Sequence, residues 1–439
     1  MSTAPRACVI GAGPSGLTAA KNLLQVGIEP VVYEARADLG GNWNATSNPD
    51  VPTVFDTTRL ISSKTLSAYE DFPFPADTDA YPRRQPLAAY FDAYAERFGL
   101  RDHIRFHVSV ESVAPIDNGW SVRIEDKTTG ERTVEPFDAV FVCNGHHATP
   151  RIPAVFQGHD DRVVHSSAFW RATPFAGERV LVVGGGNSGC DIAVEVSRVA
   201  KTTHLSWRRG YHIVPRHLFG MPSDVVLSTI TWLPDRWIAF LADQTIRRLK
   251  GRPSDHGLPT PEHGFFDCHP IINDDLPRRV RAGRIAMRRD VESLDRASDG
   301  LEVRFVDGVE DRYDRIIVCT GFEIRFPFLS RDVVDFAEGS VPLYLRVFDP
   351  RWPGLFFIGL IQPMGCIWPL ADLQAKLAAN LLVGNYRLPA DHARRAERDA
   401  DAIVRRFVDS PRHAIEVDYH AYRRQLLRAL PSTAPPWTD

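Results

Sequence analysis

The sequence lacks the features of several common protein classes. Its six cysteines are scattered through 439 residues without a CxxC pair, which argues against a zinc site, a disulfide framework and a redox-active dithiol. It contains no run of about 18 apolar residues, so we expect no membrane-spanning segment. The net charge of −3 is close to zero. We therefore expect neither nucleic acid nor an acidic membrane surface as a partner.

The N-terminal residues give no sign of a secretory signal. Met1–Arg6 is short, and the apolar run behind it leads into glycines, not into a small-residue cleavage site. Cys8, Cys143 and Cys319 stand in apolar runs typical of buried strands. These observations predict a reduced, cytoplasmic protein. Apolar residues make up 44% and charged residues 24%, as in an ordinary globular enzyme, and the length predicts more than one core.

A glycine-rich turn stands near the N-terminus. The apolar run Ala7–Ile10 precedes Gly11-Ala-Gly-Pro-Ser-Gly16, and Leu17–Val26 has helical spacing. Glycines at such a turn let the backbone approach a pyrophosphate, which then faces the helix N-terminus. Glu34 stands 18 residues after Gly16, where a carboxylate accepts hydrogen bonds from ribose hydroxyls. FAD and NAD both satisfy this pattern, and we assign to the site Gly11, Gly13, Pro14, Ser15, Gly16 and Glu34.

A second loop of the same form lies in the middle of the chain. The apolar run Val180–Val183 leads into glycines and then a helical stretch. Arg208 lies 19 residues after Gly189, where an NAD-specific site would carry an acid. Two guanidinium groups can pair with a 2′-phosphate, which favours NADPH over NADH. We assign to this site Gly184, Gly186, Asn187, Ser188, Gly189, Arg208 and Arg209.

Most of the chain resembles the flavin-containing monooxygenase family. The resemblance rests on Asp38-Leu-Gly-Gly-Asn-Trp43, on the proline-bounded Asp71-Phe-Pro-Phe-Pro75, and on Asp138–His147 and Arg315–Phe322, which look like the family's crossovers between domains. The resemblance implies a flavoprotein with FAD at the first loop and NADPH at the second.

The family's fingerprint motif is matched in part. His165 and Phe169 stand at its histidine and aromatic positions, but Asp161 and His159 stand where glycine and phenylalanine are expected. The related Baeyer–Villiger monooxygenases prefer tryptophan at the position of Phe169, and here Trp170 comes one residue late. The motif therefore favours the first family and leaves the second open.

The resemblance implies an α/β fold with two Rossmann-type dinucleotide-binding domains, the NADPH domain inserted in the FAD domain. The expected parts are 1–150 for the first part of the FAD domain, 151–320 for the NADPH domain with a helical insertion at about 211–275, and 321–439 for the second part of the FAD domain and C-terminal helices. Within the insertion, Val225–Ala242 is expected to form helices over a pocket; a lipid-contacting surface is the alternative. Further FAD contacts implied by the resemblance are Gly41, Asn42, Trp43, Val110, Gly359 and Gln362.

Two dinucleotide sites in one chain imply a hydride donor and an acceptor. By resemblance, NADPH reduces FAD, a C4a-hydroperoxyflavin forms with O2, and a nucleophilic nitrogen or sulfur of a small molecule receives one oxygen atom. The alternatives are Baeyer–Villiger oxidation of a ketone, an NADPH oxidase that releases hydrogen peroxide, and a non-catalytic nucleotide sensor. Whether the chain forms a homodimer is left open.

One departure from the family concerns the oxygen chemistry. Ile61, in Leu60-Ile-Ser-Ser-Lys64, falls where the family has a flavin-side asparagine. Isoleucine cannot donate a hydrogen bond, so Ser62 or Ser63 is the candidate substitute. If neither substitutes, reducing equivalents are lost as hydrogen peroxide. The adjacent His146 and His147 have no third ligand nearby, and we expect no metal.

Overall fold

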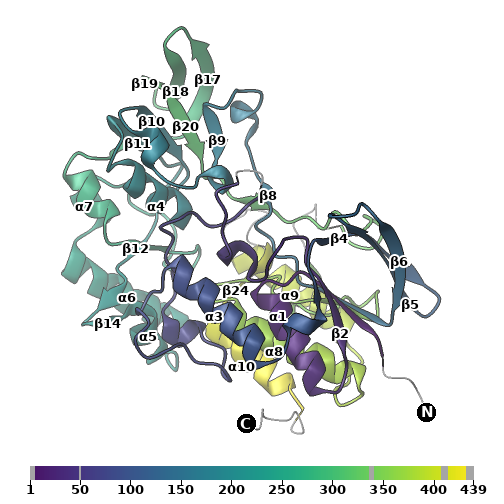
Figure 1. Ribbon diagram of the computed structural model, residues 1–439. Helices are drawn as coiled ribbons and strands as arrows, with labels where there is room; N and C mark the ends of the chain where they lie inside the picture. Colours follow the sequence, from purple (N-terminus) through teal and green to yellow (C-terminus); the bar gives the residue numbers. More distant parts are fainter. Residues whose placement is uncertain (1–4, 49–50, 336–340, 407–413, 432–439) are drawn as a thin grey trace. The chain divides into compact units, whose positions relative to one another are not determined.

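The chain forms two compact units, each built from more than one segment. The computed structural model describes residues 5–48, 51–335, 341–406 and 414–431 (Figure 1). The first unit comprises Met1–Asn44, Lys64–His146 and Ile324–Asp439. The second comprises Ala45–Ser63 and His147–Glu323. Residues 45–63 therefore belong with the second unit, although they follow the first glycine-rich loop in sequence.

A five-stranded parallel sheet with the order β22-β7-β1-β2-β3 forms the centre of the first unit. Its central strand β1 consists of apolar residues that are all buried. This is expected for a parallel strand that is covered on both faces. The strands are β1 (Ala7–Ile10), β2 (Pro30–Tyr33), β3 (Ile104–Arg105), β7 (Ala139–Val142) and β22 (Leu355–Phe357).

Helix α1 (Pro14–Gln25) begins directly after the first glycine-rich turn. Pro14 occupies its first turn, where the missing N–H costs no hydrogen bond, and Gly27 follows its end with a φ of 79°. The helix packs against α8 (Trp368–Leu382), and the two lie together in Figure 1. The other helices of this unit are α2 (Lys64–Ser67), α3 (Arg84–Arg97), α9 (His392–Arg406) and α10 (Tyr419–Ala429).

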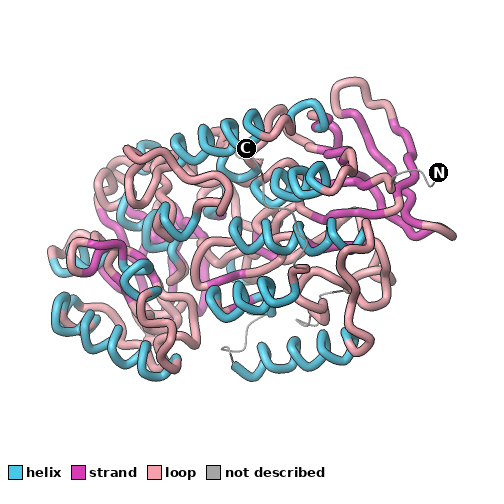
Figure 2. The backbone as a smooth tube through the Cα atoms, turned by 90° about the horizontal axis from the view of Figure 1, so that it is seen from below, coloured by secondary structure: helices cyan, strands magenta, loops and turns pink. Residues whose placement is uncertain are grey.

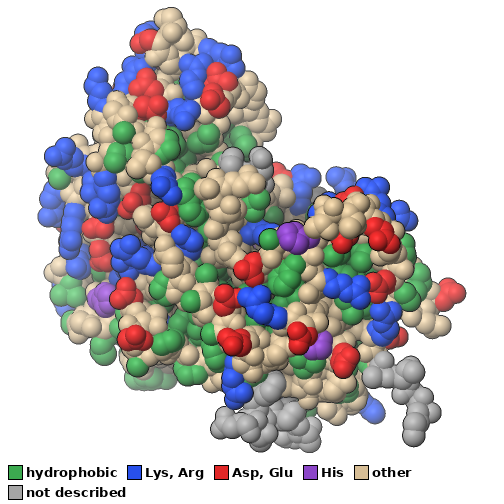
Figure 3. Space-filling view, viewed as in Figure 1, with side chains coloured by type: hydrophobic (Ala, Val, Ile, Leu, Met, Phe, Trp, Pro, Cys, Tyr) green, Lys and Arg blue, Asp and Glu red, His purple; other side chains and the backbone are tan. Residues whose placement is uncertain are grey.

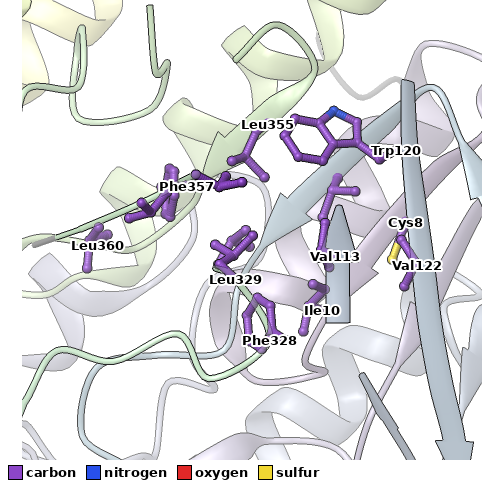
Figure 4. Packing of buried hydrophobic residues seen from close by; sticks show 14 of the residues in the cluster. Cys8, Ile10, Val113, Trp120, Val122, Phe328, Leu329, Leu355, Phe357 and Leu360 are labelled. Atoms are coloured by element: carbon purple, nitrogen blue, oxygen red, sulfur yellow. The ribbon is translucent and has the colours of Figure 1, made fainter. Parts of the chain in front are cut away.

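A three-stranded antiparallel sheet packs against the parallel sheet of the first unit; its strands are magenta at the right of Figure 2. It consists of β4 (Val108–Ile116), β5 (Gly119–Asp126) and β6 (Arg132–Phe137). Trp120 and Val122 of β5 join Cys8 and Ile10 of β1 in one buried cluster, with Phe357 of β22 (Figure 4). Strand β23 (Gln362–Pro363) pairs with β24 (Glu416–Val417) in the C-terminal part.

The second unit repeats the parallel arrangement. Its sheet has the order β16-β11-β10-β20-β9, and all neighbouring strands are parallel. Helix α4 (Asn187–Val196) follows β10, as α1 follows β1. The strands are β9 (Val163–His165), β10 (Arg179–Val183), β11 (Thr202–Ser206), β16 (Ala286–Arg288) and β20 (Arg315–Val318), with an antiparallel sheet of β17 (Val291–Ala297), β18 (Gly300–Phe305) and β19 (Glu310–Tyr313). The two sheets confirm the predicted α/β class.

Two short strands, β8 (Thr149–Pro150) and β21 (Phe322–Glu323), lie where the chain passes between the units. They pair antiparallel, with Phe322 opposite Pro150. The pairing therefore joins the residues directly after Asp138–His147 to the end of Arg315–Phe322, the two segments that the sequence identified as crossovers.

An insertion separates β11 from β16 in the second unit. It contains short strands, three helices and a 3-10 turn. None of the described helices is both long and apolar enough to span a bilayer. Its elements are β12 (Ile213–Val214), β13 (His217–Leu218), β14 (Met221–Pro222), α5 (Ser223–Ser228), α6 (Asp235–Lys250), η6 (Pro253–His256), β15 (Ile271–Ile272) and α7 (Leu276–Arg281).

Candidate functional site

The first glycine-rich loop leaves no room for side chains at two of its glycines. A Cβ atom on Gly16 would lie 1.8 Å from the carbonyl oxygen of Gly11, so α1 sits directly on the end of β1. Gly11 has a φ of 98°, which favours glycine. The backbone of Gly41 approaches Gly13, because a Cβ on Gly41 would lie 3.1 Å from the Cα of Gly13. The loop thus presents bare backbone at the N-terminus of α1, as a diphosphate site requires.

The Glu34 side chain is fixed at the end of β2. It is 7% exposed, and its two oxygens accept hydrogen bonds from the backbone N–H of Ala12 at 2.7 Å and of Arg36 at 2.9 Å. A carboxylate oxygen has two lone pairs, so each can accept one further hydrogen bond. The carboxylate is therefore oriented beside the loop and can still accept from a ribose hydroxyl, which fits an adenine dinucleotide.

Two residues predicted for the first site, Gly359 and Gln362, come from much later in the chain and have different neighbours. Gly359 adjoins the start of α1, because a Cβ there would lie 2.2 Å from the Ser15 Oγ. Its N–H donates to Gln374 Oε1 at 2.8 Å, which fixes the turn after β22. Gln362 begins β23, and its Oε1 lies 3.3 Å from His146 Nε2.

The segment Gly41–Trp43 forms a 3-10 turn that contacts α8. Trp43 meets Trp368 edge-on, with ring centroids 5.7 Å apart. Arg36 donates to the carbonyl oxygen of Gly41 at 2.8 Å, and its Nη2 lies 3.4 Å from Asn42 Oδ1. Val110 lies further along the chain, in β4 beside a bulge between Val110 and Ser112.

A buried ionic cluster that sequence reasoning missed holds α1 against α8. Lys21 Nζ lies 2.6 Å from Asp71 Oδ2 and 2.6 Å from Asp372 Oδ1, and Thr18 donates to Asp372. Burial by itself would lower the pKa of Lys21 and raise that of Asp372. The pairing outweighs burial, so the pKa of Lys21 is raised and that of Asp372 is lowered. The one indication of this cluster in the sequence was Asp71, which begins the proline-bounded motif Asp71-Phe-Pro-Phe-Pro75.

The second loop shows that one glycine was overlooked. Cβ atoms would lie 2.3 Å from the Cys319 carbonyl oxygen at Gly184 and 2.2 Å from the Gly184 carbonyl oxygen at Gly189. A Cβ on Gly185 would lie 2.0 Å from the Tyr211 ring. Gly186 has extended backbone and precedes the first turn of α4. The tightly packed glycine between Gly184 and Gly189 is therefore Gly185.

The two polar residues in the first turn of α4, Asn187 and Ser188, differ in whether their side chains are free to contact a bound cofactor. Asn187 Oδ1 accepts from the Ile272 N–H at 2.8 Å, and its Nδ2 lies 3.4 Å from the Pro270 carbonyl oxygen. Asn187 thus ties the insertion to α4. Ser188 is exposed. Deeper in the helix, burial raises the pKa of Asp191 to about 6, although Arg216 and a 2.6 Å hydrogen bond from Asn273 oppose the rise.

The two arginines after β11 have different environments. Arg208 is exposed and forms no ion pair with any described residue. Arg209 is partly buried, donates to Cys268 Sγ at 3.4 Å and lies over the Tyr211 ring at 5.5 Å. Arg208 is thus the arginine available to an external phosphate.

The serines of the Leu60–Lys64 loop are buried. Ser62 is 4% and Ser63 0% exposed, whereas Ile61 is partly exposed. The Ser63 N–H donates to Asp224 Oδ2 at 2.6 Å, and the Ser63 hydroxyl has no hydrogen-bond partner among the described residues. A buried hydroxyl without a partner is unfavourable, and at 0% exposure the Ser63 hydroxyl is closed to solvent in this structure.

The segment that leads to this loop is anchored on the fingerprint motif. Phe55 meets Phe169 edge-on with centroids 5.5 Å apart, and the Asp56 N–H donates to the Trp170 carbonyl oxygen at 3.0 Å. Phe169 is buried and also stacks on Phe175. The fingerprint aromatic therefore positions residues 45–63 on the second unit.

The fingerprint histidine also has a structural role. The Ser167 N–H donates to His165 Nδ1 at 3.1 Å, so His165 Nε2 carries the proton and donates to the Gly321 carbonyl oxygen at 3.0 Å. Burial lowers the pKa of His165 to about 4, which the hydrogen bond to Gly321 opposes. In its neutral form, the His165 imidazole thus holds the crossover segment at Gly321.

Within the described parts of the chain, no group of three His, Cys, Asp or Glu side chains has the arrangement of a metal site. All six cysteines are buried free thiols.

Comparison with known proteins gives a match over almost the whole chain. Residues 4–435 match a family model described as Flavin-binding monooxygenase-like. Flavin-containing monooxygenase 5 of Rattus norvegicus is 36% identical over 436 residues, which cover 94% of this chain and 80% of the relative. Dimethylaniline monooxygenase [N-oxide-forming] 2 of the same organism is 33% identical over 451 residues, covering 96% of this chain and 82% of the relative.

Solved structures share the fold over the same extent. S-allyl-L-cysteine S-oxygenase from Allium sativum superposes with a TM-score of 0.70 at 22% identity, covering 97% of this chain and 88% of the other. A structure of OTEMO in complex with FAD and NADP superposes with a TM-score of 0.72 at 18% identity and 98% coverage of both chains. At these identities the likeness concerns the fold.

Proposed function

We propose that this chain, because it belongs to the flavin-containing monooxygenase family, transfers one atom of O2 to a nucleophilic nitrogen or sulfur of a small molecule. The chain is an NADPH-dependent oxidoreductase, and its cofactors are FAD and NADPH. Overall, the substrate, O2, NADPH and a proton give the oxygenated substrate, water and NADP⁺. The observation that carries the choice of nitrogen or sulfur is the identity with relatives named as monooxygenases, one of them N-oxide-forming.

We assign FAD to the first unit on the geometry of its loop. The bare backbone at Gly11–Gly16 and Gly41 would hold the diphosphate, and Glu34 would accept from the ribose. Bound flavin supplies hydride acceptance and oxygen activation. The protein would bind and orient the flavin. Helix α8 begins at Trp368, and the positive end of its dipole would favour negative charge on a group bound in front of that residue.

NADPH is assigned to the second unit. Gly184–Gly189 and the N-terminus of α4 would hold its diphosphate, and Arg208 would pair with the 2′-phosphate. Arg209 would contribute less, because Cys268 and Tyr211 already occupy its guanidinium. The proposed domain parts are those expected from the sequence, with 45–63 packed on the second unit.

The Leu60–Lys64 loop is proposed as the oxygen-side element. Ile61 supplies no hydrogen bond, whereas the Ser63 hydroxyl is buried without a described partner. Asp224 fixes the Ser63 backbone and so acts as a positioning residue for Ser62 and Ser63. In this arrangement a serine hydroxyl, not an asparagine amide, would supply the hydrogen-bond donor of the oxygen-side element.

A product assay tests the function. The purified flavoprotein is supplied with NADPH, O2 and one of three probes: N,N-dimethylaniline, methyl phenyl sulfide or cyclohexanone. We expect the N-oxide or sulfoxide, with NADPH consumption matched to product. A lactone from cyclohexanone alone would instead establish Baeyer–Villiger oxidation, and hydrogen peroxide without oxygenated product would establish an NADPH oxidase.

We further propose a cytoplasmic location, because six free thiols in buried positions are typical of reducing compartments. Homodimer formation is a second proposal, and light scattering of the flavin-loaded protein would test it directly.

A further inference from the structure

The insertion of the second unit contains a cavity, here called the insertion cavity. It has a volume of about 410 Å³ and is lined by residues of α6, η6 and α7 and by the segments beside them. Its lining includes none of the residues Gly184–Gly189, Arg208 or Arg209. Cavities that hold small ligands commonly measure about 300–1,000 Å³, so it has the size of a ligand site.

The floor of the insertion cavity is apolar. Ile246, Leu258 and Phe265 line it and are 8%, 3% and 6% exposed. These residues come from α6 and from the segment after η6, so the floor is part of the packed insertion. Apolar groups at such a floor favour a ligand with a hydrocarbon portion, because its burial removes apolar surface from water.

The rim of the insertion cavity carries surplus positive charge. Five cationic side chains line it against two aspartates, in a chain with a net charge of −3. Both aspartates are already engaged: Asp243 pairs with Arg247 at 2.9 Å, and Asp274 pairs with Arg216 at 3.6 Å. Lys250 and Arg278 form no ion pair with any described residue. The five cations are Arg247, Lys250, Arg252, Arg278 and Arg281, and in Figure 3 blue side chains gather over α6 and α7.

One rim cation is held in place by neutral partners. Arg281 Nη2 donates to His256 Nδ1 at 2.7 Å, and His256 Nε2 donates to the Lys250 carbonyl oxygen at 2.6 Å. This chain of hydrogen bonds connects α7, η6 and the end of α6. It orients Arg281 without neutralising its charge.

We propose that the insertion cavity binds a small amphipathic monoanion, with its carboxylate at the cationic rim and its hydrocarbon part on the apolar floor. Its lining shares no residue with either dinucleotide loop, and binding does not depend on the oxygenation reaction.

Octanoate is a suitable probe, with octanol as its neutral counterpart and acetate as its short counterpart. Calorimetry on the flavin-loaded protein should show octanoate binding at least tenfold more tightly than either. Arg278→Glu should weaken octanoate binding by about tenfold, as expected for one charge-assisted contact. Arg248→Glu is the matched control, because Arg248 is exposed on α6 but does not line the cavity. Equal affinity for octanol, or an unchanged affinity in Arg278→Glu, would overturn the proposal.

A labelling experiment tests the location independently. Ser254 is exposed and lines the cavity, whereas all six native cysteines are buried. A bulky maleimide should therefore react selectively with a Ser254→Cys variant. We expect octanoate binding in the unlabelled variant and its loss after labelling, with NADPH oxidation unchanged in both. Octanoate binding that survives complete labelling would place the ligand elsewhere and refute the proposal.

Discussion

At the scale of single residues, neighbouring side chains of one type have unequal roles. Arg208 and Arg209 are adjacent and have the same charge, but only Arg208 is exposed and without an ion pair among the described residues. Arg209 is engaged by Cys268 and Tyr211. Under the proposed NADPH assignment, preference for the 2′-phosphate would therefore depend mainly on Arg208.

Arg208→Ala should raise the KM for NADPH by roughly 10–100-fold, because a hydrogen bond to a charged group contributes about 1.5–3 kcal/mol. The KM for NADH should stay the same, since NADH has no 2′-phosphate. Steady-state kinetics with both cofactors measure the effect, and Arg209→Ala serves as the comparison with a smaller change. Equal increases for NADPH and NADH would contradict the assignment.

Two glycines of the first loop allow a matched comparison. A Cβ on Gly13 would have space, since its nearest neighbour, Gly41 Cα, is 3.6 Å away, whereas a Cβ on Gly16 would overlap backbone at 1.8 Å. Gly13→Ala should therefore fold normally but bind FAD at least tenfold more weakly, because the methyl group stands where the diphosphate approaches. Gly16→Ala should lower the yield of folded protein itself. Flavin content and circular dichroism separate the two effects, and normal flavin retention in Gly13→Ala would argue against diphosphate at this loop.

At the scale of elements, the oxygen-side loop depends on a helix distant in sequence. Residues 45–63 pack on the second unit through Phe55, Phe169 and the Asp224 carboxylate of α5. The insertion that carries α5 therefore fixes the loop on which Ser62 and Ser63 stand. If the Leu60–Lys64 loop is the oxygen-side element proposed above, α5 would support oxygenation through this contact without touching the reacting atoms.

Asp224→Ala should increase the hydrogen peroxide released per NADPH several-fold, because the Ser63 N–H loses its acceptor and the loop loses its position. Asp224→Asn should restore much of the coupling, since an amide oxygen also accepts a hydrogen bond. The rate of flavin reduction by NADPH should be equal in both variants. A peroxide yield that stays at the wild-type level in Asp224→Ala would show that the contact does not position the loop.

At the scale of the whole molecule, buried titratable groups make stability depend on pH. Burial lowers the pKa of both His165 and His204 to about 4, against an ordinary value of 6.5. Below about pH 6.5 the unfolded chain takes up protons that the folded chain does not bind. The stability that these histidines contribute is therefore complete above pH 6.5 and is lost as the pH falls towards 4.

Urea unfolding of the second unit should show this loss, with His165 alone accounting for roughly 3 kcal/mol between pH 6.5 and 4. His165→Gln should have a shallower pH dependence by about one proton over that range. The slope above pH 7 should be the same in both proteins. An identical acid slope would mean that His165 titrates normally in the folded state.

The sequence alone predicted much of the fold and of the dinucleotide loops, because those features depend on local patterns. A strand, a glycine turn and a helix occupy about 20 consecutive residues, and backbone sterics fix where glycine is needed. The places of Glu34 after β2 and of Arg208 after β11 could be predicted for the same reason, since the length of a βαβ unit sets their distance from the loop. The need for glycine at position 185 was not predicted, because it comes from the packed ring of Tyr211, a contact that cannot be inferred from the local sequence pattern.

What only the tertiary structure decided are the contacts between segments far apart in the chain. Asp224 meets Ser63 across 161 positions, and Lys21 meets Asp372 across the first unit. Asn187, predicted as a cofactor contact, is engaged by the insertion backbone. Such contacts follow from how the elements pack, and packing depends on the combined shapes and burial of many side chains. The sequence by itself therefore determined the two strand–turn–helix loops and the family with its cofactors, while tertiary packing decided which of the predicted side chains are already engaged and which elements hold the Leu60–Lys64 loop in place.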